Sequence, residues 1–191
     1  MVRIVRGKKI MPGKKIILGA FLLLALGAVG IAQAQVFDDW IVDVKDPTFY
    51  SAVTVNDSGH EFGQVCIFNG DSSCYWVIDM STTCKKGDKY PVLANADSAA
   101  VYLEMICTGP IKGGGSGYAF TNFDQVDKLV RESKRVGFAV ALQDDEFEVV
   151  RWNLRGADTA LSAMQEAATK RLKSVPQNTR DKRLQPVAEG R

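Results

Sequence analysis

Apolar and polar residues alternate along much of the chain between residues 36 and 120. Trp40, Val42 and Val44 alternate with Ile41 and Asp43. A period of two places one set of side chains on the buried face of a β-strand. Further β-prone runs, separated by turn residues, cover 50–55, 64–68, 74–78, 90–93, 101–106 and 118–120. This part of the chain is therefore predicted to be a series of short strands.

After Phe120 the spacing of apolar residues changes to that of a helix. Asn122 or Asp124 can cap a first helix, strands follow over 136–142 and 147–154, and Asp158 can cap a second helix. The apolar stripes of the two helices are Val126, Leu129, Val130 and Ser133, and Ala160, Leu161, Met164, Ala168 and Leu172. The pattern predicts a mainly β fold, a β-sandwich or partly open barrel, with two α-helices, the C-terminal one packed on the sheet.

The N-terminal residues 1–34 have the pattern of a signal peptide. A basic stretch precedes an apolar run from Ile16 to Ile31, and the run ends in a small-residue site that predicts cleavage between Ala34 and Gln35. Met11 is an alternative start to Met1. An uncleaved inner-membrane anchor is the competing interpretation, although the run is shorter than the roughly 20 residues that span a bilayer. We expect export to the periplasm or beyond the cell.

Four cysteines follow this leader, and an even number in an oxidising compartment predicts two disulfides. Cys66 and Cys74 flank Asn69-Gly70, a strong hairpin signal that places them opposite each other across two strands. We therefore favour pairs Cys66–Cys74 and Cys84–Cys107 among the three possible connectivities. A zinc site is not expected, because there is no Cys-x-x-Cys pair and the only histidine precedes all four cysteines.

The charge of the chain is unevenly distributed. The whole sequence has a net charge of +2, but the leader holds six bases and the segment 170–191 has seven bases against two acids, which leaves −9 for residues 35–169. An acidic domain is a poor platform for nucleic acid. We divide the chain into a signal peptide (1–34), a disulfide-braced β-rich domain (35–169) and a basic tail (170–191). We expect the tail to be flexible. It is interpreted either as a segment that contacts an anionic envelope surface or as an unselected extension.

Two motifs invite a catalytic or phosphate-binding interpretation. The run Gly113–Gly117 lacks the Lys-Ser/Thr and the helix that a phosphate loop requires, so it is interpreted as a hairpin loop. His60 is the only imidazole, and the nearby Ser58 and Asp57 are too close in sequence to form a triad with it. We interpret its surroundings as an exposed turn.

Carboxylates and tryptophans form the remaining candidates. Asp144, Asp145, Glu146 and Glu148 cluster on a turn, as do Asp38 and Asp39, but neither group has the spacing of a calcium loop, and we interpret both as solvated acidic faces. Trp40, Trp76 and Trp152 occupy alternating strand positions, which predicts that at least two are buried. No residue is assigned a catalytic, metal-binding or cofactor-binding role.

Three features resemble the invasion-associated locus B family of small exported bacterial proteins. They are the strand start Phe37-Asp38-Asp39-Trp40, the paired cysteines around a hairpin, and the closing strand–Gly–helix over 152–161. The resemblance covers about 36–168 and implies a compact β-sandwich in the periplasm or at the surface, in a family of which some members are tied to host-cell invasion. The family commonly has a cysteine soon after its first Trp, where this chain has Asp43 and Val44, and a shared fold does not establish a shared function.

These observations favour a non-catalytic binding protein of the bacterial envelope, whose partner is an envelope or host protein or glycan. An inhibitor of an envelope-attacking hydrolase such as lysozyme is the alternative, because an acidic domain complements a cationic enzyme. An envelope hydrolase that uses Asp144, Asp145 and Glu148 is the third interpretation. The oligomeric state is not indicated.

Overall fold

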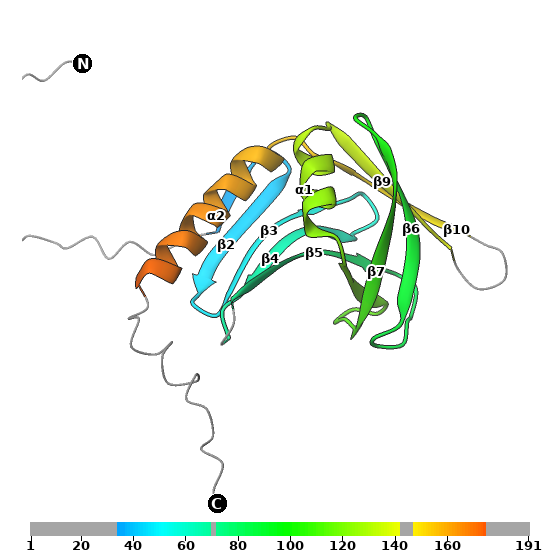
Figure 1. Ribbon diagram of the computed structural model, residues 1–191, viewed down its shortest axis with the longest axis horizontal. Coiled ribbons are helices and arrows are strands. Elements are labelled where there is room, and N and C mark those ends of the chain that lie inside the picture. The colour runs from blue at the N-terminus through cyan, green and yellow to red at the C-terminus, as the bar shows by residue number, and fades with distance from the viewer. Residues whose placement is uncertain (1–33, 70–71, 142–146, 175–191) are drawn as a thin grey trace, which may run out of the picture. The chain divides into compact units, whose positions relative to one another are not determined.

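The computed structural model describes residues 34–69, 72–141 and 147–174 (Figure 1). Its first five strands form a meander, and the later strands and two helices follow. The strands are β1 Gln35–Phe37, β2 Trp40–Asp46, β3 Phe49–Val55, β4 Glu61–Ile67, β5 Ser73–Met80, β6 Lys89–Ala96, β7 Ala100–Pro110, β8 Ser116–Phe120, β9 Arg135–Ala141 and β10 Phe147–Asn153; the helices are α1 Phe123–Arg131 and α2 Ala157–Ser174.

The ten strands form one antiparallel sheet in the order β1-β2-β3-β4-β5-β8-β7-β6-β9-β10. The sheet bends strongly between β5 and β7, so that its two halves face each other (Figure 1). The predicted mainly β fold with two helices is confirmed. Because the strands belong to one curved sheet whose end strands do not pair with each other in the described residues, the partly open barrel is the better of the two predicted arrangements.

Aromatic side chains on the inner face join the two halves of the sheet. The ring centroid of Phe62 in β4 lies 5.2 Å from that of Trp76, 5.2 Å from that of Phe138 in β9 and 5.4 Å from that of Trp152 in β10. Trp40, Trp76 and Trp152 are all buried, as predicted. Each large side chain of this kind contributes about 1.5–3 kcal/mol by its burial, so the aromatic cluster is a major stabilising contact between the halves.

The helices cover parts of the same inner face. In α1, Asn122 is the N-cap and its side chain accepts a hydrogen bond of 3.1 Å from the Gln125 amide. This helix ends at Arg131, so Ser133 lies beyond it and its hydroxyl contacts that of Ser98 at 2.7 Å instead. In α2, the expected cap Asp158 lies inside the first turn and binds Arg131 at 2.5 Å, which ties the two helices together.

The second helix packs on β2 and β3 through small and apolar residues, of which Ala160, Leu161 and Met164 are fully buried. It extends to Ser174 and therefore includes the bases Lys170, Arg171 and Lys173 of the segment predicted as a tail. Residues 175–191 lie outside the described residues. Within the described ranges, no helix is long and apolar enough to cross a bilayer.

Both disulfides form with the predicted pairing. Cys66 lies directly opposite Cys74 in the β4–β5 ladder, and the two Cα atoms are 4.0 Å apart. Cys84, in the segment between β5 and β6, is bonded to Cys107 in β7, with a Cα separation of 6.1 Å. The first bridge reinforces a hairpin, and the second fastens the connection that leads from one half of the sheet to the other.

Candidate functional site

A groove runs along the outside of the molecule where β10 lies against the outer ends of β2 and β3. We call it the seam groove, and its volume is about 830 Å³. One wall comes from β2, β3 and the turn after β3, and the other from β6, β9 and β10. The residues that line the groove include Asp39, Ile41, Val55, Leu93, Arg135, Gly137, Ala139, Val149 and Arg151.

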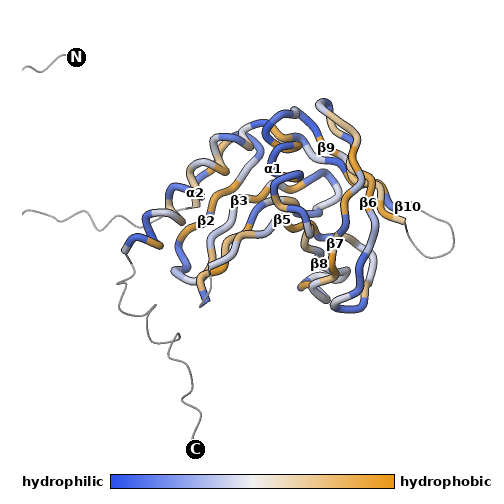
Figure 2. The backbone as a smooth tube through the Cα atoms, viewed as in Figure 1, coloured by the Kyte–Doolittle hydropathy of each residue, from blue (hydrophilic) through white to orange (hydrophobic). Residues whose placement is uncertain are grey.

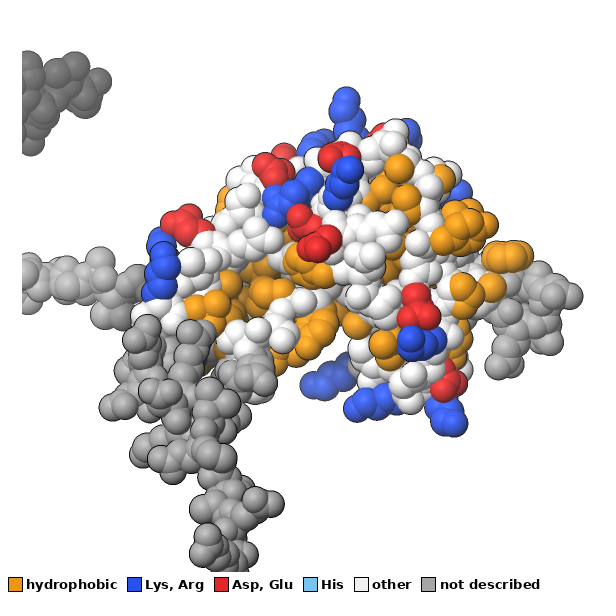
Figure 3. All heavy atoms as spheres, in the orientation of Figure 1, with side chains coloured by type: hydrophobic (Ala, Val, Ile, Leu, Met, Phe, Trp, Pro, Cys, Tyr) orange, Lys and Arg blue, Asp and Glu red, His pale blue; other side chains and the backbone are white. Residues whose placement is uncertain are grey.

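The walls of the seam groove combine exposed apolar side chains with polar and charged ones. Ile41, Val55, Leu93 and Val149 all belong to the outward-facing rows of their strands and each keeps more than a third of its surface accessible. In Figure 2 the chain around β6, β9 and β10 is largely hydrophobic, and Figure 3 shows apolar atoms at the surface on that side. Apolar residues gathered at a concave surface are typical of a binding site rather than of an ordinary solvated face.

Small residues line the part of the groove formed by β9. Gly137 faces Arg151, and a Cβ at position 137 would lie 3.2 Å from Cγ of that arginine. The glycine therefore lets the arginine stem lie flat on the sheet. Ala139, the next outward residue of β9, adds only a methyl group to the floor of the groove.

Charged residues of the groove differ in whether they are already paired. Asp39 accepts a hydrogen bond of 2.8 Å from Arg155, and this hydrogen bond raises the pKa of the Arg155 guanidinium. Asp97 accepts from the Arg135 amide at 3.0 Å and lies 3.5 Å from its guanidinium. Among the described residues no salt bridge reaches Arg151.

A second cluster surrounds His60, on the inner side of the same seam. Ser81 Oγ lies 3.2 Å from the Nε2 atom of His60, Asp79 Oδ1 lies 3.8 Å from its Nδ1, and Glu148 Oε1 lies 3.9 Å from its Nε2. Partial burial raises the pKa of the Asp79 carboxyl, although its Oδ1 accepts a hydrogen bond from the Glu61 amide. The flanking turn residues Asp57, Ser58 and Gly59 are exposed, as expected, whereas the His60 side chain itself is only 15% accessible.

The cluster brings together a serine, a histidine and an aspartate, but not in the geometry of a nucleophilic triad. A triad requires the carboxylate to bind the Nδ1 proton and thereby fix the tautomer. The 3.8 Å between His60 and Asp79 is longer than a hydrogen bond. The cluster is therefore best described as a polar contact between the β3–β4 turn, the end of β5 and β10.

The glycine run lies beside this cluster. Gly113, Gly114 and Gly115 turn the chain from β7 to β8 with positive φ angles, and a Cβ on Gly115 would collide with the Met80 carbonyl. A strand and not a helix follows the run, so the predicted hairpin loop is confirmed. A small polar pocket of about 420 Å³ separates the loop from His60 and Ser81.

Of the carboxylates singled out in the sequence, Asp39 lines the seam groove. Asp144, Asp145 and Glu146 fall outside the described residues, so the acidic turn is represented by Glu148 alone, which points to the inner side. Asp38, with a φ of 50°, and Asp39 form the β1–β2 turn. Across residues 34–69, 72–141 and 147–174, no three potential metal ligands lie together.

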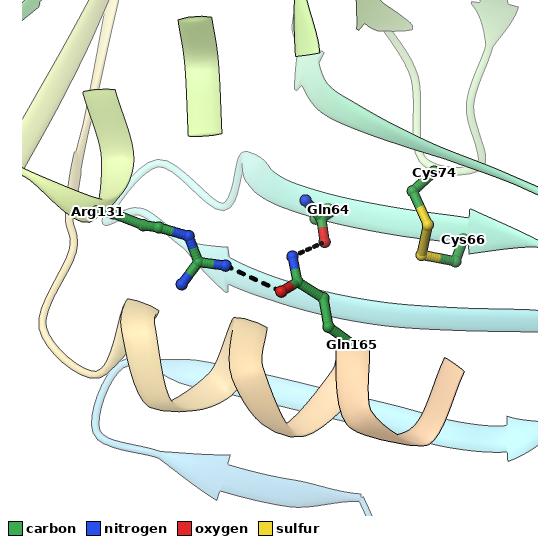
Figure 4. The surroundings of a disulfide bond; sticks show 5 residues. All are labelled: Gln64, Cys66, Cys74, Arg131 and Gln165. Atoms are coloured by element: carbon green, nitrogen blue, oxygen red, sulfur yellow. Dashed lines mark hydrogen bonds between the residues drawn. A yellow bond between two sulfur atoms is a disulfide. The ribbon is translucent and has the colours of Figure 1, made fainter. Parts of the chain in front are cut away.

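A buried polar contact joins α1, α2 and the sheet close to the first disulfide (Figure 4). Arg131 donates to the Gln165 side chain at 3.1 Å, and Gln165 donates to Gln64 Oε1 at 3.1 Å. Gln64 is completely buried, and its Nε2 has no partner among the described residues. This chain of contacts fixes how the two helices sit on the inner face of the sheet.

No protein-family model and no curated protein matches the chain. Three chains among the solved structures match, and one of the matching structures is invasion associated protein B from Bartonella henselae. The two chains are 14% identical with a TM-score of 0.51, over 72% of this chain and 99% of the Bartonella protein. A likeness at that identity concerns the fold. The chain therefore has the fold of invasion associated protein B, in agreement with the resemblance inferred from its sequence.

Proposed function

We propose that the protein is an exported, non-catalytic binding protein of the bacterial envelope, and that the seam groove is its contact surface for a protein or glycan partner. The observation that supports this most directly is the groove itself, a concave surface that combines exposed apolar side chains with polar and charged ones, among them an arginine that no salt bridge reaches within the described ranges. Binding surfaces combine apolar contact area with a few polar groups in this way.

Export is supported by the N-terminal pattern and by the two disulfides, which persist in oxidising compartments. Cleavage before Gln35 would leave the first strand intact, because Gln35 pairs with Val42 in β2. The fold shared with invasion associated protein B is compatible with an envelope protein. Mass spectrometry of the purified native protein under non-reducing conditions tests this part, and we expect Gln35 as its first residue and no free thiol.

Site-specific photo-crosslinking in intact cells tests the groove. Benzoylphenylalanine is introduced at Leu93, in the groove, or at Tyr75, an exposed residue of β5 outside it. We expect a discrete crosslinked product from position 93 that is absent from position 75. Equal products from both positions, or none from either, would contradict the assignment of the groove as the contact surface.

A further inference from the structure

The open sheet has two edge strands, and they are protected to very different degrees. Within the described residues β1 pairs only with β2, and β10 pairs only with β9. An edge strand presents unpaired amide and carbonyl groups on which another strand can form. Proteins usually shorten or cover such edges, so an uncovered one indicates a surface for strand pairing.

The β1 edge is short and covered. It spans three residues, and Gly156 lies so close that a Cβ there would collide with the carbonyl oxygen of Phe37. The Asp39 amide also donates to the carbonyl of Arg155 at 3.4 Å. The segment that leads into α2 therefore occupies the space that an additional strand would need.

The β10 edge is longer, and it is exposed at its Phe147 end, whereas Trp152 near its other end contacts the β3–β4 turn. It spans seven residues without proline, and its outward row begins with Phe147, 68% accessible, and Val149, 46% accessible. Its inward row includes Val150 and Trp152, which are buried and hold the strand in place. Val149 and Arg151 of the outward row also line the seam groove. A strand edge and a concave surface with exposed apolar and charged side chains thus lie side by side.

We propose that an extended segment of another polypeptide adds as a strand to the free edge of β10, with alternate side chains in the seam groove. This proposal rests on the proposed function and specifies its partner. Only an extended polypeptide supplies amide and carbonyl groups at the repeat of a strand edge, which a glycan does not.

The charges and apolar residues of β10 specify the incoming strand. Its outward side chains meet Phe147 and Val149 and should be apolar, and the one near Arg151 should be acidic, because the described residues provide no salt bridge for that arginine. On the inward side, the strand passes Glu148, whose carboxylate lies 3.9 Å from His60. A neutral polar residue fits there better than an acid.

Fluorescence anisotropy with a designed peptide tests the proposal. The probe is a labelled seven-residue peptide in which threonine alternates with two valines and one aspartate. We expect it to bind the mature protein, and we expect Arg151→Glu to weaken binding about three- to tenfold, since an attraction is replaced by a repulsion. A peptide with lysine in place of the aspartate should reverse this order and prefer the variant.

Two controls separate strand pairing from general adhesion. The same peptide methylated on alternate backbone amides cannot complete a ladder and should not bind, while Tyr102→Lys, in a strand paired on both sides, should bind as the wild type does. Equal binding of the methylated peptide would overturn the proposal. So would a concentration-dependent dimer that Val149→Lys dissociates, because a second copy would then occupy the edge. If crosslinking from position 93 succeeds and no peptide binds, the groove remains the contact surface and strand addition alone is refuted.

Discussion

The indole of Trp152 donates a hydrogen bond of 2.9 Å to the backbone carbonyl of His60, 92 positions earlier in the chain. This bond joins the last strand of the sheet to the β3–β4 turn, so it lies where the curved sheet comes closest to closing. Trp152 is buried, and the side chain of His60 is largely buried. The ring of Trp152 also contacts Phe62. The seam groove on the outside depends on this contact on the inside.

Replacing Trp152 by phenylalanine should destabilise the fold more than its loss of volume explains. The variant keeps an aromatic ring but leaves the His60 carbonyl without its donor, and an unsatisfied buried acceptor costs about 1–3 kcal/mol. Trp40→Phe is the matched control, because Trp40 is equally buried and its indole nitrogen has no partner in the described residues. Urea denaturation should show the larger loss for Trp152→Phe, and equal losses would contradict a role for the hydrogen bond.

The contact between Gln64 and Gln165 leads to a second prediction. Gln165→Leu should cost about 1–3 kcal/mol, since it removes the donor to a fully buried amide and leaves that amide unsatisfied. The double variant Gln64→Leu with Gln165→Leu should recover most of this loss, because both polar groups are then gone. Urea denaturation of the two single variants and the double variant measures the interaction energy. Additive losses would show that the two amides do not interact.

Much of the β architecture is predictable because the signals are local. The alternation that begins at Trp40 marks one face of a strand, and Asn69-Gly70 marks the turn that sets Cys66 opposite Cys74. That single pairing fixes the register of the hairpin. The disulfide assignment follows from it, because the two remaining cysteines have only each other.

The order of the strands in the sheet cannot be predicted from such local sequence signals. Strand β8 lies between β5 and β7, and β9 adds to the far side of β6, so that segments distant in sequence become neighbours. Such pairings depend on which apolar faces pack together and not on local turn residues. The bend that brings Trp152 to His60 is of the same kind. For this reason the seam groove has no signature in the sequence.

The cluster around His60 is an intermediate case. Extending the Cys66–Cys74 register along the hairpin pairs Phe62 with Ile78 and therefore places His60 beside Asp79 and Ser81. The hairpin register therefore contains the signal for this neighbourhood, which the adjacent residues Ser58 and Asp57 do not. The contribution of Glu148 could not be inferred, because it depends on the bend of the sheet.

Because the Asp79 carboxyl is partly buried, we predict that the free energy of unfolding decreases as pH rises through the pKa of this group. Burial raises its pKa above the value of 3.8 expected for an unfolded chain, so the folded state binds the proton more tightly than the unfolded state does. Stability therefore falls as pH rises from about 3.8 through the raised pKa. Asp79→Asn removes this loss and keeps an oxygen for the Glu61 amide. The variant should be more stable than the wild type at neutral pH, with a difference that disappears towards pH 3.8.

Asp46 provides a control of opposite sign. Hydrogen bonds from the Thr48 hydroxyl and amide, both 2.7 Å, lower its pKa. Its ionised form stabilises the fold above about pH 3.8, and this contribution is lost as pH falls through the lowered pKa. Asp46→Asn should therefore be less stable than the wild type at neutral pH. Urea midpoints measured from pH 3 to pH 7.5 compare the two variants, and differences of the same sign would refute the assignment.

Labelling of Ser81 by a serine-directed probe would show whether the protein has hydrolytic activity. A serine nucleophile needs a histidine whose tautomer is fixed by a carboxylate, and the Nδ1 of His60 lies 3.8 Å from Asp79, beyond hydrogen-bond range. We therefore expect a fluorophosphonate probe to leave the mature protein unlabelled at neutral pH, with Ser81→Ala and a known serine hydrolase as the two reference samples. Labelling that Ser81→Ala abolishes, together with ester hydrolysis lost in His60→Gln, would show instead that the cluster closes into a working triad and that the protein is an enzyme.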